Sequence, residues 1–187
     1  MRRRASTGSI VMPRRYAVAG PHARRPWAER EGARPRHTLA GMPPDVRAAR
    51  MRDLDPLTLY ALLRLRTDVF VVEQECPYPE LDGRDAEPDT EHLWVEVDGA
   101  PVATLRLLRG GEGAAYRIGR VATHREHRGH GYAAALVTEA LRRAGGTPVE
   151  IDAQTYLEGW YARFGFRRSG PDFLEDGIPH LPMRREA

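Results

Sequence analysis

The clearest periodic segment of the chain is 131–144, where apolar residues recur at intervals of three and four positions. Such a repeat gives a helix one continuous apolar face. Its members are Ala133, Leu136, Val137, Ala140, Leu141 and Ala144. Two glycines, Gly145 and Gly146, follow directly, as is typical of a helix end. The pattern therefore predicts a helix over 131–144.

Two further helices are predicted from weaker signals. Asp55 before Pro56 is typical of a helix start, because the carboxylate can accept hydrogen bonds from the first free N–H groups. An apolar stripe follows at Leu59, Leu62, Leu63 and Phe70. Residues 69–72 are expected to continue this helix or to end it in a buried turn. The other helix is predicted over 155–165, with Leu157, Trp160, Tyr161 and Phe164 on its inner side.

Alternating and short apolar runs predict the strands. Residues 92–97 alternate, Asp98-Gly99 is a strong hairpin signal, and 101–108 is the expected partner strand. Further strands are expected at 46–51, 115–123, 149–153, 166–173 and 180–185. The order predicts a mixed α/β domain that starts antiparallel and contains one strand–helix–strand crossover.

Charge is distributed unevenly along the 187 residues. All 29 basic residues are Arg, and the formal net charge is +3. Residues 1–50 hold 12 Arg against three acids, a net charge of +9, so residues 51–187 carry −6. The absence of Lys and Asn matches a GC-rich coding sequence. The pI near 9.3 is therefore weak support for a nucleic-acid partner.

The basic end divides the chain into an extension, 1–44, and a domain, 45–187. The extension lacks helical or strand periodicity and contains many prolines, so it is predicted to be disordered or to result from an upstream start codon. A transit peptide or a tail that binds nucleic acid are the alternatives. No apolar run approaches the roughly 18 residues of a membrane span, and the single cysteine, Cys76, suits a reducing cytoplasm.

Residues 119–133 carry the candidate chemistry. The segment Arg128-Gly129-His130-Gly131-Tyr132-Ala133 lies between a predicted strand and the start of the 131–144 helix. Unpaired N–H groups and the helix dipole hold a phosphate well at such a place, and the glycines let the backbone approach it. Taken alone, the pattern fits a tight turn almost equally well.

A second motif makes the assignment more specific. The 128–133 segment resembles the pyrophosphate loop of the GCN5-related N-acetyltransferases (GNAT), and 160–166 resembles their Tyr-x-x-x-Gly-Phe segment. Gln154 stands where that family usually has Asn. Segments 59–66, 69–78, 81–83 and 176–180 narrow the resemblance to the ElaA-like branch. It covers about 135 residues, from near Met51 to the C-terminus.

The resemblance implies a fold, a co-substrate and a reaction. The fold is an α/β (α+β) GNAT domain with a splayed, mostly antiparallel sheet of six to seven strands and about four helices. The expected activity is direct acetyl transfer from acetyl-CoA to a primary amine, with Tyr161 as general acid; by pattern alone, Tyr161 would be a core aromatic. The residues expected to bind the coenzyme are Val121, Ala122, Thr123, Arg128, Gly129, His130, Gly131, Tyr132, Ala133 and Gln154.

Several residues are candidates for the general base and for the acceptor site. The fourth strand offers Arg117 and Arg120 where many family members have a Glu. Glu73, Glu75 and His92 are the candidates for a base or a contact with the amine, and Glu91 and His180 are further candidates for the base. The acidic segment 73–91 is expected to attract a cationic amine. Glu75, Asp82, Glu91 and His180 are the candidate acceptor residues.

Neither a metal site nor a cysteine nucleophile is predicted. His124, His127 and His130 have metal-like spacing but lie in the predicted phosphate loop, so no metal is expected. Cys76 lacks the ordering of a nucleophile with a histidine and an acid.

Two other functions are alternatives to acetyl transfer. A non-catalytic module that binds CoA or a partner is the first alternative, and nucleic-acid binding through the basic tail is a remote one. A homodimer stays open, and no membrane partner is expected.

Overall fold

The computed structural model describes residues 44–111 and 114–187, which form one eight-stranded sheet with three α-helices. The prediction for the 1–44 extension concerns residues that, apart from Pro44, lie outside this part. The helices are α1 (Pro56–Thr67), α2 (Tyr132–Ala144) and α3 (Glu158–Ala162). The strands are β1 (Val46–Arg50), β2 (Glu91–Val97), β3 (Ala100–Leu108), β4 (Tyr116–Thr123), β5 (Val149–Gln154), β6 (Arg167–Arg168), β7 (Phe173–Glu175) and β8 (Ile178–Arg185).

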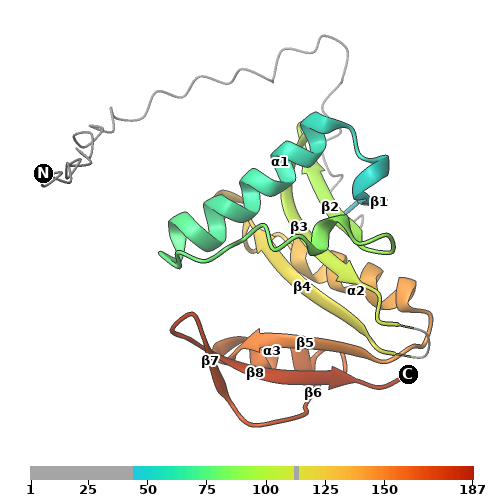
Figure 1. Cartoon of the computed structure of the whole chain (residues 1–187), viewed down its shortest axis with the longest axis vertical. Coiled ribbons are helices and arrows are strands. Elements are labelled where there is room, and N and C mark those ends of the chain that lie inside the picture. Colours follow the sequence, from blue (N-terminus) through green and yellow to red (C-terminus); the bar gives the residue numbers. More distant parts are fainter. Residues whose placement is uncertain (1–43, 112–113) are drawn as a thin grey trace, which may run out of the picture. The chain divides into compact units, whose positions relative to one another are not determined.

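The sheet opens between its two central strands. Its order is β1-β2-β3-β4-β5-β8-β6, with β7 paired to β8, and every pair is antiparallel except β4–β5. That parallel pair joins only two positions, Tyr116 to Val149 and Arg117 to Glu150. Beyond them the strands separate, as the yellow β4 and orange β5 show in Figure 1. The sheet is therefore two half-sheets joined at one end.

A bulge in β4 explains why the strands separate. Arg106 pairs with Gly119 and Thr104 with Ala122, so Arg120 and Val121 together face the single residue Leu105. Arg120 has a φ of 54°, in the left-handed region that non-glycine residues rarely adopt. A bulge bends and twists its own strand. Here it turns the second half of β4 away from β5.

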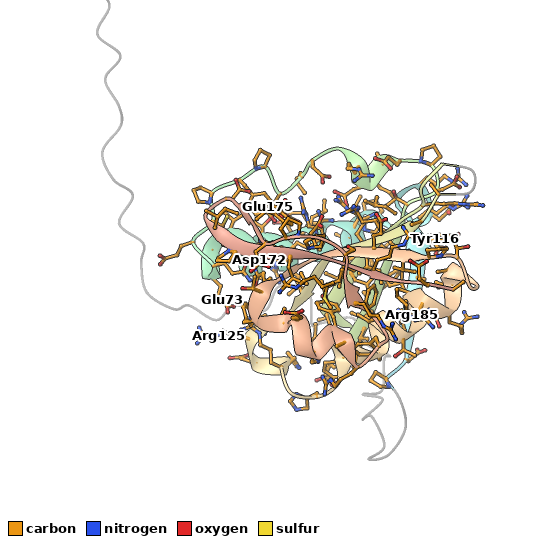
Figure 2. All side chains as sticks on the ribbon, turned by 90° about the horizontal axis from the view of Figure 1, so that it is seen from below. Glu73, Tyr116, Arg125, Asp172, Glu175 and Arg185 are labelled. Atoms are coloured by element: carbon orange, nitrogen blue, oxygen red, sulfur yellow. The ribbon has the colours of Figure 1, made fainter. Side chains whose placement is uncertain are left out.

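The helices pack on both faces of the sheet. Successive strand residues point to opposite faces, so Leu105 and Leu107 of β3 join the core formed with Leu136 and Val137 of α2. On the other face, Leu65 and Val69 pack against Ala122. Figure 2 shows α2 and α3 below the sheet and the 73–90 segment above it. Different elements therefore cover the two faces of the sheet.

Most predicted elements are confirmed, with differences at their ends. Asp55 caps α1, its Oδ1 accepting from the N–H groups of Leu57 and Thr58 at 3.0 and 3.1 Å. Residues 69–72 continue the helix as one π-helical segment, Asp68–Glu73. The predicted 155–165 helix is a 3-10 turn, Thr155–Leu157, followed by the five-residue α3.

The number of elements also differs from the prediction. The described residues contain eight strands instead of six or seven, because two short strands, β6 and β7, replace the single strand predicted over 166–173, and β7 extends beyond that range. They contain three α-helices instead of four, and other turns of the chain are short 3-10 segments. Short segments carry too few residues to show a period, so pattern alone misjudges them.

Candidate active site

A cleft of about 410 Å³ lies where β4 and β5 separate. Residues of both half-sheets line it. From β4 come Ile118, Gly119, Arg120 and Val121, and from β5 come Ile151, Asp152, Ala153 and Gln154. Tyr161 of α3 and His180 of β8 also line it, as do Asp82 and Tyr78 from the segment between α1 and β2. One continuous space thus joins the centre of the sheet to the face that carries α1.

The loop after β4 forms a site suited to an anion at the start of α2. Gly131 is the N-cap of this 13-residue helix, and no side chain caps its first turn. Gly129 and Gly131 have φ values of 80° and 81°, and a Cβ built at either would meet no atom within 4 Å. The first N–H groups of a helix have no partner within it and attract negative charge. The loop therefore fits a pyrophosphate.

Arg128, the predicted phosphate-binding cation, is paired with a carboxylate in this structure. Its guanidinium donates two hydrogen bonds to Glu73, at 2.7 and 2.8 Å, and Nε donates to the carbonyl oxygen of Thr123 at 3.1 Å. The hydrogen bond from Arg128 lowers the pKa of Glu73. Glu73 is therefore an ion-pair partner of the loop, and Arg128 can bind a phosphate only by sharing or exchanging this partner.

The histidines of the loop are oriented by backbone groups. Nδ1 of His130 lies 3.0 Å from the carbonyl oxygen of Arg128 and 3.2 Å from that of His127, so this nitrogen carries the proton. The His130 ring stacks on Tyr132, with centroids 5.7 Å apart. Across residues 44–111 and 114–187, no three His, Cys, Asp or Glu side chains are arranged to hold a metal ion.

Tyr161 stands in the cleft with most of its ring packed in the core. Its exposed fraction is 6 %, and its ring makes edge contacts with Trp160 and Phe166, at centroid distances of 4.7 and 5.9 Å. Burial raises the pKa of this phenol above its ordinary value. The hydroxyl therefore keeps its proton at neutral pH, as a general acid must. Core aromatic and cleft residue are both correct descriptions of Tyr161.

Gln154 of β5 connects its side of the cleft to the segment that follows α1. Its amide Nε2 donates to Oε1 of Gln74 at 3.3 Å, and its Oε1 accepts from the Tyr156 hydroxyl at 2.7 Å. A second contact across the cleft joins Sγ of Cys76, in the segment after α1, to the carbonyl oxygen of Asp176, 3.8 Å away. The turn between β7 and β8 and the segment after α1 are therefore neighbours at the rim.

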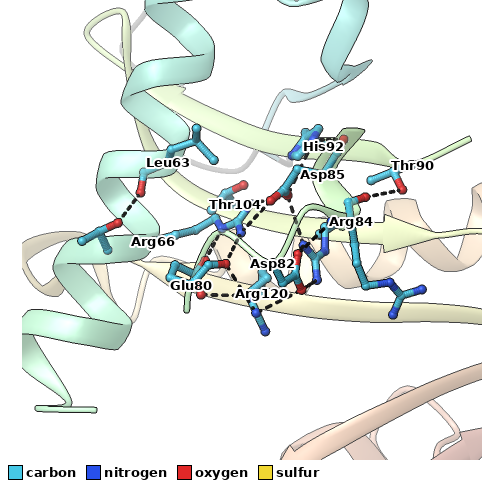
Figure 3. Close-up of polar contacts among 12 residues, drawn as sticks. Leu63, Arg66, Glu80, Asp82, Arg84, Asp85, Thr90, His92, Thr104 and Arg120 are labelled. Carbon is cyan, nitrogen blue, oxygen red and sulfur yellow. Dashed lines mark hydrogen bonds and ion pairs between the residues drawn. The ribbon is translucent and has the colours of Figure 1, made fainter. Parts of the chain in front are cut away.

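Three acids of the 73–91 segment bind the protein's own arginines. Arg66 donates to Glu80 and to Asp85, the latter at 2.6 Å, although Arg66 is only 1 % exposed. Arg106 donates two bonds of 2.7 Å to Asp82. Figure 3 shows Arg66 and Arg120 gathered around these carboxylates. We call this set the buried ion network; its members are Arg66, Glu80, Asp82, Asp85, Arg106 and Arg120.

Arg120 completes the buried ion network at the bulge. Its Nε lies 2.8 Å from Oε2 of Glu80, and one terminal nitrogen lies 3.2 Å from Asp82. Its guanidinium also lies over the ring of Tyr78, 5.2 Å from the centroid. These contacts hold the left-handed backbone of Arg120. They also leave Glu80, Asp82 and Asp85 with cationic partners, which weakens the expected attraction of this segment for an amine.

The candidate bases and acceptor residues are not gathered in one place. Asp82 and His180 line the cleft. Glu73 pairs with Arg128, and Glu91 pairs with Arg143 of α2 at 3.0 Å. His92 is 1 % exposed, and burial lowers its pKa. Glu75 is exposed, at a φ of 53°.

Comparison with known proteins agrees with this geometry. A sequence model described as an acetyltransferase (GNAT) domain matches residues 66–187, more than half of the chain. This chain belongs to the GNAT family. It is 54 % identical to a UPF0039 protein of Mycobacterium tuberculosis over 138 residues, covering 72 % of this chain and 88 % of the relative.

Two solved GNAT-family relatives share the fold. The crystal structure of Escherichia coli ElaA matches with a TM-score of 0.72 and 34 % identity, covering 76 % of this chain and 99 % of that one. An acyl-CoA N-acyltransferase from Pseudomonas aeruginosa matches with a TM-score of 0.71 and 45 % identity, covering 75 % and 99 %. The predicted GNAT fold and the likeness to ElaA are thus confirmed. None of the described helices has the length and apolar character to cross a membrane.

Sequence reasoning missed the buried ion network of this GNAT domain and the bulge at Arg120. One signal was available: Arg66 stands four residues after Leu62 and three before Val69, on the apolar face of its helix. A charged residue at such a position predicts a buried partner. The bulge has no comparable signal, because Arg is not the residue expected at a positive φ.

Proposed function

We propose that this chain transfers the acetyl group of acetyl-CoA to a primary amine of a small molecule or protein, by direct attack in a ternary complex. The observation that carries the proposal is a single cleft that combines a proton donor with a route to an anion site. Tyr161 lines the cleft from α3, and Val121 lines it from β4, whose following loop, 124–131, leads to the uncapped start of α2. A nucleotide thioester needs both an anion site and a proton donor within reach of sulfur.

Each residue has a defined part in this proposal. The N–H groups after Gly129 and the guanidinium of Arg128 would hold the pyrophosphate. An N–H of the bulged strand, at Val121 or Ala122, would donate to the thioester carbonyl oxygen and stabilise its developing charge. Bound acetyl-CoA supplies the activated acetyl group. The amine nitrogen bonds to the carbonyl carbon, the carbon–sulfur bond breaks, and Tyr161 gives its proton to the departing sulfur.

A second proton transfer returns Tyr161 to its neutral form. The nitrogen loses one further proton when the amide forms, and the Tyr161 phenolate can accept it. Overall, an ammonium and a thioester give an amide, a thiol and one proton released to solvent. This sum requires one more group, which removes the first proton from the ammonium before attack.

A non-catalytic module that binds CoA remains the second candidate. The observation that favours it is the lack of a carboxylate on β4, where Arg117 pairs with Asp152 and Glu150 of β5. Both functions predict coenzyme binding, and only the first predicts turnover.

The test has two measurements on the full chain. Calorimetry should detect binding of CoA and acetyl-CoA, and a thiol-specific dye should detect CoA release when a panel of alkylamines, amino acids and lysine peptides is added. Binding with amine-dependent release supports acetyl transfer. Binding without release for any amine supports the second candidate, and no binding by folded protein contradicts both.

A further inference from the structure

His180 lines the cleft from β8. It is the third residue of β8 and pairs in register with Gln154 of β5. Residues directly opposite in an antiparallel pair point to the same face. Gln154 reaches across to Gln74 of the segment after α1, so His180 also faces this side of the cleft. Its side chain is 11 % exposed, and it lines the same space as Tyr161.

One hydrogen bond fixes which nitrogen of His180 carries the proton. Nδ1 lies 2.8 Å from the carbonyl oxygen of Ile178. A carbonyl oxygen can only accept, so Nδ1 is the donor and the neutral ring has its lone pair on Nε2. The ring also stacks on Phe173, at 5.9 Å between centroids and 26° between planes. The imidazole is thus held in one orientation and one tautomer.

A carboxylate stands beside the free nitrogen. Oε2 of Glu175 on β7 lies 3.8 Å from Nε2, within ion-pair distance if the ring takes a proton. Figure 2 shows Glu175 on the side of the sheet that carries the 73–90 segment, away from α3. From β5 the facing side chain is the uncharged Gln154, which accepts from the Tyr156 hydroxyl. A ring oriented at one nitrogen, with an acid close to the other, is suited to accept and stabilise a proton.

We propose that His180 is the general base that deprotonates the acceptor ammonium, an inference that rests on the acetyl transfer proposed above. Nε2 takes one proton from the ammonium, which leaves a neutral amine and an imidazolium beside Glu175. The amine then attacks the thioester, Tyr161 protonates the sulfur, and the imidazolium releases its proton to solvent. Three other acids near the cleft have arginine partners: Glu73 pairs with Arg128, Asp82 with Arg106 and Arg120, and Asp152 with Arg117.

The first test is His180→Asn, whose amide can keep the hydrogen bond to Ile178 but has no basic nitrogen. With an alkylamine, kcat/KM at neutral pH should fall by about 10²–10⁴-fold, while the Kd of acetyl-CoA stays within about two-fold. An aromatic amine is already neutral at pH 7 and needs no base. The variant should therefore acetylate it nearly as fast as the wild type does, which a structural role would not allow.

The outcomes separate this inference from the proposed function. If the wild type acetylates no amine, the proposed function fails. If it does and His180→Asn is equally active on alkylamines, or loses alkyl and aromatic acceptors alike, His180 is not the base.

A second pair of variants tests the same idea without altering His180. Glu175→Gln removes the charge beside Nε2 that stabilises the imidazolium, so kcat/KM for an alkylamine should fall about two- to five-fold at low salt and by less at high salt, where the charge is screened. Asp172→Asn is the matched control, because Asp172 is a nearby exposed acid whose partner is Arg168. An unchanged kcat/KM in Glu175→Gln, or an equal fall in Asp172→Asn, would contradict the assignment.

Discussion

The two walls of the cleft bury ionisable groups in opposite ways. The wall formed by α1, β3, β4 and the segment after α1 contains the buried ion network, in which three arginines face three carboxylates. The wall formed by β5, α3 and β8 contains single groups, Tyr161 in an aromatic cluster and His180 between a carbonyl and Glu175. Each wall is buried enough to shift proton equilibria, yet only one has groups free to exchange protons.

The comparison teaches that number and burial of charges do not identify catalytic groups. In a closed network every charge stabilises another, so removing a proton from one member disturbs the rest. A single oriented group has fewer competing partners and can respond to a substrate. Under the proposed acetyl transfer, the first wall serves stability and shape, and the second serves chemistry.

The largest expected effect is the loss of Arg66 from the buried ion network. Arg66→Met leaves Glu80 and Asp85 without their shared partner in a buried site, which should lower the free energy of unfolding by about 3–5 kcal/mol. Urea unfolding at pH 7 measures it. Arg64→Met, on the exposed side of the same helix, should change stability by only about 0.5 kcal/mol. Equal effects would show that the network has no special part in stability.

Loss of the Tyr161 hydroxyl should leave the fold intact and reduce turnover. Tyr161→Phe keeps the aromatic contacts, so acetyl-CoA should bind as in the wild type while kcat falls by about 10²–10⁴-fold. Steady-state thiol release and calorimetry measure the two quantities. Tyr60→Phe, an exposed tyrosine on α1, is the control. An unchanged kcat would remove Tyr161 from the chemistry and reduce the difference between the walls.

Acid should weaken the first wall more than the second. Burial alone would raise the pKa of Asp85, but the hydrogen bonds and charges of Arg66 and then Arg106 outweigh this effect, so the pKa of Asp85 is lowered. The pKa of Asp82 is lowered in the same way, mainly by Arg106. A lowered folded-state pKa stabilises the protein above the unfolded value of about 3.9. This stabilisation is lost as pH falls from about 4 through the folded-state pKa.

The pH effect can be measured with one pair of variants. Asp82→Asn should be less stable than the wild type by about 1.5–3 kcal/mol at pH 7, and the gap should narrow at pH 3. Asp53→Asn, at an exposed acid beside Arg52, should follow the wild-type curve. A gap of the same size at both pH values would contradict the assignment of the Asp82 charge to this network.

The smallest expected effect concerns Glu73, which faces the coenzyme loop. Glu73→Gln removes a charge that competes with phosphate for Arg128, so CoA should bind about two- to five-fold more tightly at low salt. Asp68→Asn, an acid earlier in the same π-helical segment, should leave the affinity unchanged. Weaker binding in Glu73→Gln would mean that Glu73 orients Arg128 for the phosphate instead of competing for it.

The geometry of the loop after β4 could be predicted from sequence because its signals are local. Gly129, Gly131 and the periodic helix that follows lie within one short segment, and backbone geometry dictates their use. The hairpin at Asp98-Gly99 was predictable for the same reason, with both residues at positive φ. The family resemblance then added Tyr161, which periodicity alone would assign to the core.

The acceptor half could not be predicted because its contacts are long-range. Arg128 and Glu73 are 55 residues apart, and Gln154 and Gln74 are 80 apart. An acidic run is usually a solvated surface, so nothing in 73–91 separates the buried Asp85 from its exposed neighbour Glu87. The tautomer of His180 depends on a backbone carbonyl two residues away, which only the turn between β7 and β8 brings into position.

One measurement tests acetyl transfer in this cleft most directly. Acetyl-CoA, an amine that gives CoA release and the full chain are incubated together, and mass spectrometry counts acetylated amine against free CoA thiol. We predict one acetylated amine for each thiol, with both products reduced to the same extent in Tyr161→Phe. Thiol release without acetylated amine, or tight acetyl-CoA binding with neither product for any amine, would contradict the account.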